Sequence, residues 1–285
     1  MKLITWNVQW CRGVDQKVDP ARVVADARRI ADFDVLCLQE IADNFPDPLL
    51  GGSNGEDQFA VLASLLPGYT AIPGVAVDQI GPNGTRRRFG NMILSRLPVL
   101  QAYRHMLPYP ADHDVPGMPR VAVEAVVRAD VGDVRIITTH LEYYSQRKRA
   151  AQVDGLRDVY AEGFAYAANP RVGGDDEGPY LAQPRPAHTV ITGDFNLEPD
   201  DPLHQRMGER FDNGAPPLFD AWQVMHPGKP HDPTFKIYEK KAPDEPELHC
   251  DFIFVSESLR TRVATLWVDT RTQVSDHQPV LLELR

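Results

Sequence analysis

Apolar residues recur along the chain with two spacings, and the spacing indicates the type of each element. Between residues 2 and 8, apolar and polar side chains alternate as in a half-buried strand. Val23, Ala27 and Ile30 follow at helical spacing, and Asp19-Pro20 supplies a cap and a first helical residue. The same reasoning predicts helices at residues 20–33, 58–66, 145–168 and 202–209. It predicts strands at residues 2–8, 34–40, 69–77, 89–96, 99–107, 121–128, 134–141, 188–191, 250–256, 263–268 and 280–284, with small β pieces near residues 220 and 234.

The predicted strands outnumber the helices, and the two types are mixed along the sequence. This order favours two packed β-sheets with helices on their outer faces. No fixed-period repeat, low-complexity segment or linker divides the 285 residues. Polar residues of the catalytic type occur near both ends and in the middle, so a shared site needs the whole chain. We therefore expect residues 1–285 to form a single domain.

Composition and charge narrow the classes of function. The net charge of −10 argues against nonspecific binding to long duplex DNA, because such binders usually present a basic surface. No apolar run approaches the ~20 residues that span a bilayer, and no signal peptide is visible. Cys11, Cys37 and Cys250 are widely spaced and odd in number, which fits a reducing compartment. We expect a soluble cytoplasmic protein without a membrane anchor; nothing in the sequence predicts its oligomeric state.

The strongest local signal for chemistry is Gly193-Asp194-Phe195-Asn196, which follows the apolar run at 188–191. A strand that ends in this way presents a carboxylate and an amide on one face of a strand-to-loop corner. Gly193 allows the backbone to bend there or lets another group approach closely. A carboxylate in this place can take a proton from water, which suits hydrolysis at an electron-poor centre.

Further polar residues stand at the ends of predicted strands. They are Asn7, Glu40, Asn91, His140, Asp251, Asp276 and His277. Carboxylate and amide oxygens without thiolates suit a hard cation such as Mg²⁺ or Mn²⁺. Two histidines add an acid or a base that works near neutral pH. Together these groups suit the attack of water on a phosphoester.

At these residues the chain resembles the endonuclease/exonuclease/phosphatase superfamily, which has the fold of DNase I. The resemblance rests on ordered motifs that extend over essentially the whole chain. They are Trp6-Asn7, Leu38-Gln39-Glu40, Gly90-Asn91-Met92-Ile93-Leu94-Ser95-Arg96, Thr139-His140-Leu141, Gly193-Asp194-Phe195-Asn196, Asp251-Phe252-Ile253-Phe254 and Ser275-Asp276-His277. Each motif alone is common, but their joint order and spacing form a strong signal.

The resemblance implies a four-layer α/β sandwich of two central mixed sheets flanked by helices, with the site at one edge. It implies a hydrolase of phosphodiester or phosphomonoester bonds that uses Mg²⁺ or Mn²⁺ and acts on nucleic acid or a small molecule. The implied metal ligands are Asn7, Glu40 and Asp276. The implied catalytic residues are Asp194, which activates water, Asn196 and His140 at the phosphate, and His277 held by Asp251. Substrate contacts are expected from Asn91, Arg120, Asn196 and Tyr143.

The sequence also predicts how His277 is held. Adjacent residues of an extended segment point to opposite sides, so Asp276 and His277 do not face each other. Asp276 is then free to face the metal, and His277 needs a distant partner, for which we predict Asp251. One position departs from the family's pattern, because Gln9 stands where some nuclease members carry an acidic residue. The departure makes the metal site less anionic.

Several alternative interpretations follow from other parts of the sequence. A non-catalytic protein that keeps the fold and binds a phosphate ligand or nucleic acid is the main alternative to an enzyme. Residues 51–55 match the Gly-x-Ser-x-Gly pattern of serine hydrolases but lack the apolar strand before it. His226 and His231 are candidate zinc ligands, although their spacing fits no standard site. Residues 82–88 form a predicted turn whose three arginines are either solvated or meet an anionic substrate.

Overall fold

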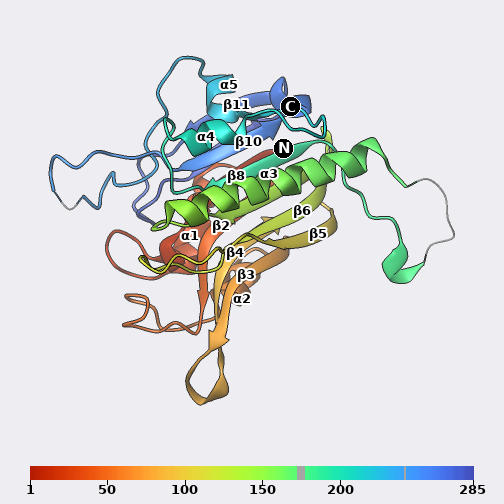
Figure 1. Ribbon diagram of the computed structural model, residues 1–285. Helices are drawn as coiled ribbons and strands as arrows, with labels where there is room; N and C mark the ends of the chain where they lie inside the picture. Colours follow the sequence, from red (N-terminus) through yellow and green to blue (C-terminus); the bar gives the residue numbers. More distant parts are fainter. Residues whose placement is uncertain (172–176, 241) are drawn as a thin grey trace.

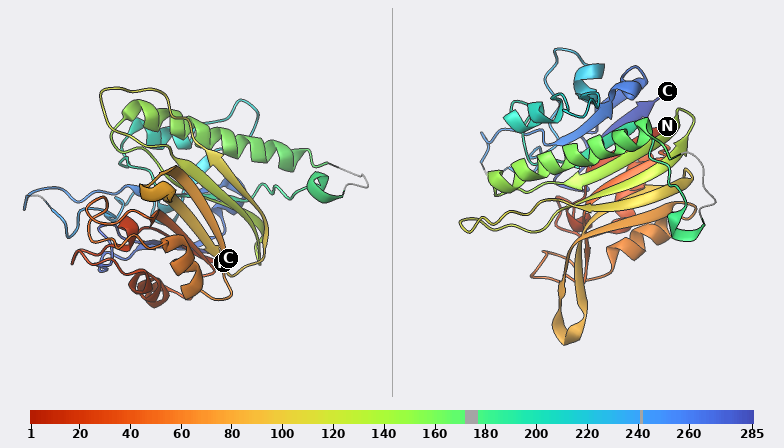
Figure 2. Two further views of the ribbon diagram at one scale, coloured as in Figure 1. Left: turned by 90° about the horizontal axis from the view of Figure 1, so that it is seen from below. Right: turned by 45° about the vertical axis from the view of Figure 1, so that its right-hand side comes forward.

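Two six-stranded β-sheets pack face to face, and helices cover both outer faces (Figure 1). The computed structural model describes residues 1–171, 177–240 and 242–285. The four layers of helix, sheet, sheet and helix confirm the α/β sandwich that the sequence predicts. Both chain termini lie together at the end of the sheets away from most of the long loops (Figures 1 and 2).

The first sheet is built around the N-terminal strand. Its order is β11 (Val263–Val268), β12 (Val280–Leu284), β1 (Lys2–Asn7), β2 (Val35–Asp43), β4 (Arg86–Ser95) and β3 (Thr70–Ile80). The pair β1 and β2 is parallel, and the other neighbours are antiparallel. The second sheet has the order β5 (Val99–Met106), β6 (Val121–Ala129), β7 (Gly132–His140), β8 (Thr189–Asp194), β10 (Asp251–Ser256) and β9 (Leu218–Asp220).

One parallel pair lies near the middle of each sheet, and this arrangement places the site. In the second sheet, β7 and β8 run parallel, with antiparallel neighbours on both sides. Parallel strands end at the same edge of a sheet. The ends of β1 and β2 therefore meet, as do those of β7 and β8, and polar residues at all four ends gather at one edge of the sandwich.

Most of the helices lie on the two outer faces, whereas the last two contribute Trp222 and Leu259 to the core between the sheets. The helices are α1 (Pro20–Ile30), α2 (Gln58–Leu65), α3 (Gln146–Ala168), α4 (Pro202–Met207), α5 (Ala221–Met225) and α6 (Glu257–Arg260), with 3₁₀ turns at Gln9–Cys11, Pro82–Gly84 and Gly178–Tyr180. Apolar residues of α1 and α2 pack on the first sheet, where Val23 and Phe59 share a core with Leu36. On the second sheet, Leu156 of α3 and Met207 of α4 lie in another core. The long α3 crosses this face (Figure 2).

The apolar layer between the sheets joins them into one body. Leu3 and Ile93 of the first sheet share this core with Val123 and Val190 of the second, and all four are fully buried. Removing such side chains from water is the main favourable contribution to folding. Close to the site, Gln39 Nε2 donates a hydrogen bond across the interface to Thr138 Oγ1, at 2.9 Å.

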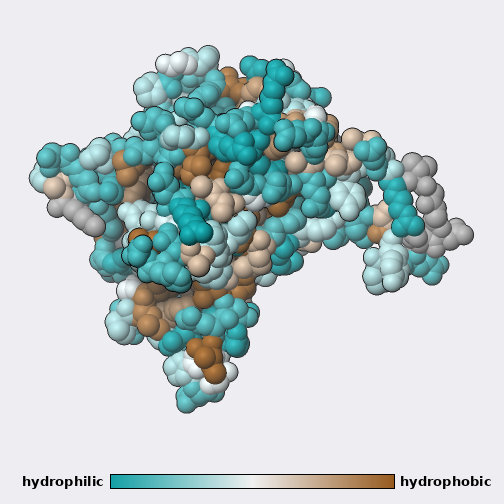
Figure 3. Space-filling view, viewed as in Figure 1, coloured by the Kyte–Doolittle hydropathy of each residue, from teal (hydrophilic) through white to brown (hydrophobic). Residues whose placement is uncertain are grey.

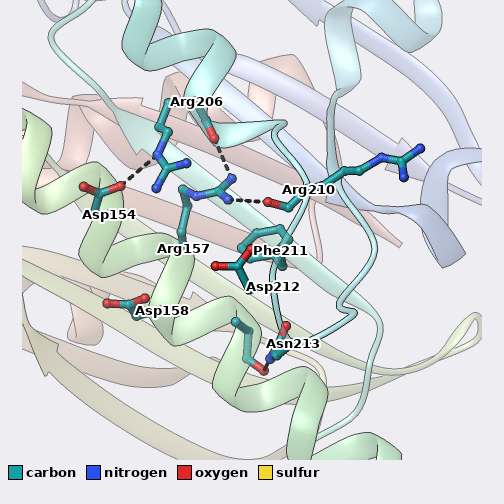
Figure 4. A pocket seen from close by; sticks show the side chains of 9 residues that line it. Asp154, Arg157, Asp158, Arg206, Arg210, Phe211, Asp212 and Asn213 are labelled. Carbon is teal, nitrogen blue, oxygen red and sulfur yellow. Dashed lines mark hydrogen bonds and ion pairs between the residues drawn. The ribbon is translucent and has the colours of Figure 1, made fainter.

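A single arginine ties α3 to the segment that follows α4. Nη1 of Arg157 donates to the carbonyl oxygens of residues 206, 207 and 209, and Nη2 donates to that of Arg210 (Figure 4). Arg206 in turn pairs with Asp154 of α3 at 2.9 Å. The side chain of Arg157 donates to main-chain carbonyls. Its position at the cavity in Figure 4 is therefore explained by its role in joining α3 to the segment after α4.

The structure differs from the sequence prediction at the three consecutive arginines. They belong to β4 rather than to a turn, and each is paired within the protein. Arg86 meets Asp78 at 2.8 Å, Arg88 meets Asp43 at 2.7 Å, and Arg87 donates to a main-chain oxygen. None of the three lines the cavity described below. The hairpin of β3 and β4 extends beyond the sheet (Figure 1).

One face of the molecular surface can be followed in a space-filling view (Figure 3). The face shown in Figure 3 is mostly teal, with small brown apolar patches, one of them near the tip of the hairpin. Within the described residues, no helix has both the length and the apolar character required to cross a membrane.

Candidate active site

A cavity of about 440 Å³ opens at the edge where the central strands end. Most of the polar residues singled out from the sequence line it. These are Glu40, Arg120, His140, Asp194, Asn196, Asp276 and His277. They come from both sheets, so the cavity lies across the edge of the sandwich.

Gly193 shapes the corner that carries Asp194. Its φ of +139° is strained for any residue with a side chain, and a Cβ there would lie 1.9 Å from the carbonyl oxygen of Thr139. Only glycine therefore lets β8 approach β7 this closely. The approach sets His140 beside Asp194 in the register, and Leu141 N–H donates to the Asp194 carbonyl.

The Asp194 carboxylate is held by two amide groups. Its Oδ1 accepts from the main-chain N–H of Asn196 at 2.9 Å, and its Oδ2 accepts from Asn7 Nδ2 at 2.9 Å. Asn196 is itself anchored, because its Nδ2 donates to the Leu141 carbonyl. Burial raises the pKa of Asp194 to about 6, and the charge of Asp251 acts in the same direction. The group is thus an anion at pH 7 with a basicity suited to accepting a proton.

Glu40 is aimed at the cavity by an irregularity in β2. The pairing of β2 with β4 shifts register between Leu38 and Ile41, and Glu40 has a φ of +62°. Such a bulge re-aims a side chain at the end of a strand. Burial raises the pKa of Glu40 to about 7, and the nearby charge of Asp276 contributes. A carboxylate that burial and a neighbouring acid make costly to ionise is a favourable place for a cation.

Asn7 and Gln9 connect the acids. Asn7 Nδ2 bridges Glu40 Oε1 at 3.2 Å and Asp194, while its Oδ1 accepts from the main-chain N–H of Gln9. Gln9 Nε2 donates to Asp276 Oδ2 at 2.7 Å. The residue that departs from the family's pattern therefore holds an acid in place by a hydrogen bond.

His277 is fixed at one ring nitrogen and on one face of its ring. Its Nδ1 lies 2.9 Å from Asp251 Oδ2, the partner that the family resemblance implies and that alternation along the segment favours over Asp276. The ring of Phe235 stacks on it with centroids 4.5 Å apart. Burial works to lower the pKa of His277, but the charges of Asp251 and Asp194 outweigh it and hold the pKa well above its usual range. The ring is therefore a cation at neutral pH.

His140, unlike His277, is uncharged. Burial, with the charges of Arg120 and His277, holds its pKa well below the usual range, so it is a neutral imidazole at pH 7. Its Nε2 lies 3.5 Å from Asp194 Oδ2, and His277 Nε2 lies 3.7 Å from the same oxygen. Both distances exceed those of good hydrogen bonds, so the Nε2 atom of neither histidine is committed to a strong bond with Asp194 in this structure.

Arg120 is buried, and some of its N–H groups have no hydrogen-bond acceptor in the described part of the chain. Its Nε and Nη1 atoms have no hydrogen-bond partner there, and its nearest acid, Glu142, is 3.9 Å from Nη2. Burial lowers the pKa of this guanidinium, since a charge is costly to remove from water. A buried cation with unused donors beside a cavity is arranged to receive an anion.

The other two expected substrate contacts occupy different environments. Tyr143 lines the cavity with 53% of its surface exposed, packed edge to face against Tyr144. Asn91 is buried, and its Nδ2 donates to the main-chain carbonyl of Val121. This bond holds β4 next to Val121, which follows Arg120 and begins β6. Asn91 does not belong to the cavity lining.

Sequence reasoning missed the aromatic part of the lining. The apolar wall consists of Trp10, Phe45, Leu50, Val77, Phe89, Met118 and Phe235. Trp10 lies in a 3₁₀ turn with a φ of +44°, and Phe235 lies in an irregular loop. Neither position follows a helical or strand period, so no sequence pattern marks them.

The weaker sequence alternatives have structural explanations. Ser53 of the Gly-x-Ser-x-Gly pattern sits in a loop, where its Oγ accepts from the main-chain N–H of Gly55. His226 Nε2 bonds to the Leu266 carbonyl at 2.8 Å rather than facing His231. The three cysteines are buried and free, so none forms a disulfide.

Comparison with known proteins places this fold and site in a family. Residues 4–277 match the Endonuclease/Exonuclease/phosphatase family, and the chain belongs to it. Members of this family hydrolyse phosphoester bonds. No curated protein matches the chain in sequence.

Solved structures of similar fold come from several organisms. An endonuclease/exonuclease/phosphatase from Beutenbergia cavernae is 23% identical with a TM-score of 0.67, over 100% of this chain and 71% of its own. D. rerio TDP2, solved with a single-strand DNA product, is 18% identical with a TM-score of 0.65, over 100% and 98%. The mannosyl-6-phosphatase of Bacteroides thetaiotaomicron is 17% identical with a TM-score of 0.61, over 100% and 99%. At these identities the likeness concerns the fold.

Proposed function

We propose that the protein is a Mg²⁺-dependent phosphoester hydrolase in which Asp194 activates water and His140, His277 and Arg120 bind the phosphate. The main observation that supports this proposal is that buried Arg120 has unpaired hydrogen-bond donors. Arg120 lines the same cavity as Asp194 and His277, so an anion bound there lies beside a proton acceptor and a second cation.

Each residue then has a defined part in the reaction. Asp194 accepts a proton from water, and the water oxygen attacks phosphorus as the bond to the leaving oxygen breaks. His277, held as a cation by Asp251, donates to a phosphoryl oxygen and is placed to supply a proton to the leaving group. Neutral His140 donates to another oxygen of the phosphate. Donors fixed in advance around developing charge are an effective source of catalysis.

The acids at the other end of the cavity fit a hard cation. Glu40 and Asp276 supply carboxylate oxygens, the donors that Mg²⁺ and Mn²⁺ prefer. Asn7 would offer its amide oxygen to the cation only with the amide turned over, because Nδ2 faces Glu40 in this structure. When bound, the ion neutralises negative charge on the phosphate. Asn91 supports the substrate site by positioning the strand that follows Arg120.

The apolar wall of the cavity indicates the chemical class of the substrate. Trp10, Phe235 and Tyr143 present aromatic rings along the cavity, next to the polar cluster. Aromatic faces stack on planar groups such as nucleobases. We propose a phosphoester with a planar or apolar substituent, either in a nucleic acid or in a small molecule.

Two broader proposals accompany the activity. We propose that residues 1–285 fold as one domain, because the site draws on Asn7 near one end and His277 near the other. We also propose the cytoplasm as the location, for which buried free cysteines give support.

Hydrolysis assays test the activity. The purified protein would be incubated with bis(p-nitrophenyl) phosphate, p-nitrophenyl phosphate, nucleic acids and sugar phosphates, with Mg²⁺, Mn²⁺ or a chelator. We expect turnover that the chelator abolishes, and a Glu40→Gln variant that needs more Mg²⁺ for half-maximal rate. Absence of turnover on every substrate, or a Mg²⁺ titration that Glu40→Gln leaves unchanged, contradicts the proposal.

DNA binding at several salt concentrations separates the two substrate classes. A nuclease that contacts several phosphates binds less tightly as salt rises. Binding without salt dependence, or no binding, favours a small phosphoester.

A further inference from the structure

Three side chains outside the active site converge on one point. His204 comes from α4, Asp220 ends β9, and His231 lies in the segment after α5. Nε2 of His204 lies 2.9 Å from Asp220 Oδ2, and Nε2 of His231 lies 2.7 Å from the same oxygen. One potential ligand atom from each of the three lies within 4.8 Å of the others. Residues that are distant in sequence thus present two imidazole nitrogens and one carboxylate oxygen to a shared position.

Neighbouring groups hold each of these side chains in its orientation. Asp220 Oδ1 accepts from the main-chain N–H of Trp222, which leaves Oδ2 directed at the two rings. Trp222 stacks on His231 with centroids 5.4 Å apart, and His204 packs on Phe252 at 4.7 Å. The side chains of all three converging residues are at most 6% exposed. A ligand set ordered in advance loses little conformational entropy when an ion binds.

We propose that His204, Asp220 and His231 form a second metal site, separate from the acids of the active site, which takes a borderline transition-metal ion such as Zn²⁺. Two imidazoles and a carboxylate are a donor set that Zn²⁺ accepts, whereas Mg²⁺ prefers oxygen alone. His204 and Asp220 also line a surface cavity of about 470 Å³. The cavity gives the ion a route from solvent and room for a fourth ligand.

The site lies at the root of a loop that reaches the active site. After His231 the chain continues to Phe235, which stacks on His277. It returns through His249, whose Nδ1 bonds to the Asp232 carbonyl at 2.6 Å. On the other side, α4 is held to α3 through Arg157 (Figure 4). An ion at the three ligands therefore anchors the loop carrying Phe235 to a fixed part of the second sheet layer.

Metal binding to matched variants tests the proposal. Protein stripped of metal would be titrated with Zn²⁺ in excess Mg²⁺, and bound zinc would be measured after desalting. We expect His204→Ala and His231→Ala each to lose one equivalent of zinc that wild type binds. His226→Ala is the control, because His226 lies near His231 in sequence but bonds to a main-chain carbonyl. Glu40→Gln should also keep this equivalent, which separates the site from the active site.

A spectroscopic measurement on wild type does not depend on the folding of variants. Co²⁺ in a four-coordinate site of nitrogen and oxygen ligands gives strong visible absorption, and Zn²⁺ should displace it. We expect the band to appear in wild type and in Glu40→Gln. No such band in wild type, or equal zinc content in wild type and both histidine variants, overturns the proposal.

Discussion

Nδ1 of His277 lies 2.9 Å from Oδ2 of Asp251, and this pair joins the two sheets at the active site. Asp251 begins β10 of the second sheet, and His277 stands just before β12 of the first. The neighbouring Asp276 faces the other way and accepts from Gln9. The two adjacent residues thus serve different ends of the cavity, with the cation of His277 on one side and an acid on the other.

Asp251→Asn removes the charge that keeps His277 protonated while preserving the shape of the side chain. Because Asp251 raises the pKa of His277, its loss lowers that pKa, and the cationic form is lost at a lower pH. We expect the alkaline limb of kcat/KM against pH to move to lower pH, and kcat to fall ~100-fold. Asp154→Asn, at an exposed acid on α3, is the control. A profile with an unmoved alkaline limb would contradict the role given to His277.

Arg120→Met separates substrate binding from folding. The guanidinium is buried with unused donors, so its removal relieves a cost of burial, and we expect unchanged or higher stability to urea. Inorganic phosphate should inhibit the variant at least roughly 10-fold more weakly, since hydrogen bonds from charged donors are lost. Arg86→Met, which removes an arginine paired with Asp78 on the hairpin, should leave this inhibition unchanged. Equal inhibition of wild type and Arg120→Met would remove Arg120 from the phosphate site.

Gly193→Ala tests the close approach of β7 and β8. The added Cβ would meet the Thr139 carbonyl at 1.9 Å, in a backbone conformation with φ of +139°. We expect the free energy of unfolding to fall by more than about 1 kcal/mol, together with a loss of activity. Gly68→Ala is the matched control, because Gly68 also has a positive φ but open space around it. Equal destabilisation by both changes would show that backbone strain alone, and not the contact with Thr139, explains the effect.

The buried pair of Glu124 and Arg135 predicts how stability depends on pH. Burial works to raise the pKa of Glu124, but hydrogen bonds from His105 and Arg135 outweigh it and lower the pKa from 4.5 to about 2. The ionised Glu124 stabilises the folded state fully at pH values above its pKa in the unfolded chain. This stabilisation is lost as pH falls towards the pKa of Glu124 in the folded protein. This shift corresponds to roughly 3 kcal/mol.

Urea unfolding at several pH values between neutral and strongly acid conditions measures this contribution. We expect the free energy of unfolding of wild type to decrease as pH falls through that window, and Glu124→Gln to show a smaller decrease. Parallel curves for the two proteins would assign the acid sensitivity to other carboxylates. Glu124→Gln should also be less stable at pH 7, because Arg135 then remains buried without its anion.

The sequence predicts the layers and the polar cluster because both depend on local periods. Strand ends carry Asn7, Glu40, His140 and Asp194, and parallel pairing brings such ends to one edge whatever the loops do. Alternation along an extended segment excludes Asp276 as the partner of His277, whereas Asp251 itself is predicted from the family resemblance.

The course of a loop and the contacts between distant segments do not follow a local period of the sequence. The stacking of Phe235 on His277 depends on the course of an irregular segment, and no period of the sequence reports it. His231 illustrates the same limit. The sequence offers the nearby His226 as its companion in a zinc site, whereas the fold brings in His204 and Asp220. The arginines at 86–88 suggest a free basic loop, but in β4 Arg86 and Arg88 pair with acids and Arg87 donates to a main-chain oxygen.

Hydrolysis of a phosphodiester in water labelled with heavy oxygen tests most directly whether water activated by Asp194 attacks phosphorus. We predict that the label appears in the phosphorus-containing product, and that Asp194→Asn lowers the rate at least ~100-fold. Label in the released alcohol, or a rate that Asp194→Asn leaves unchanged, would contradict this mechanism.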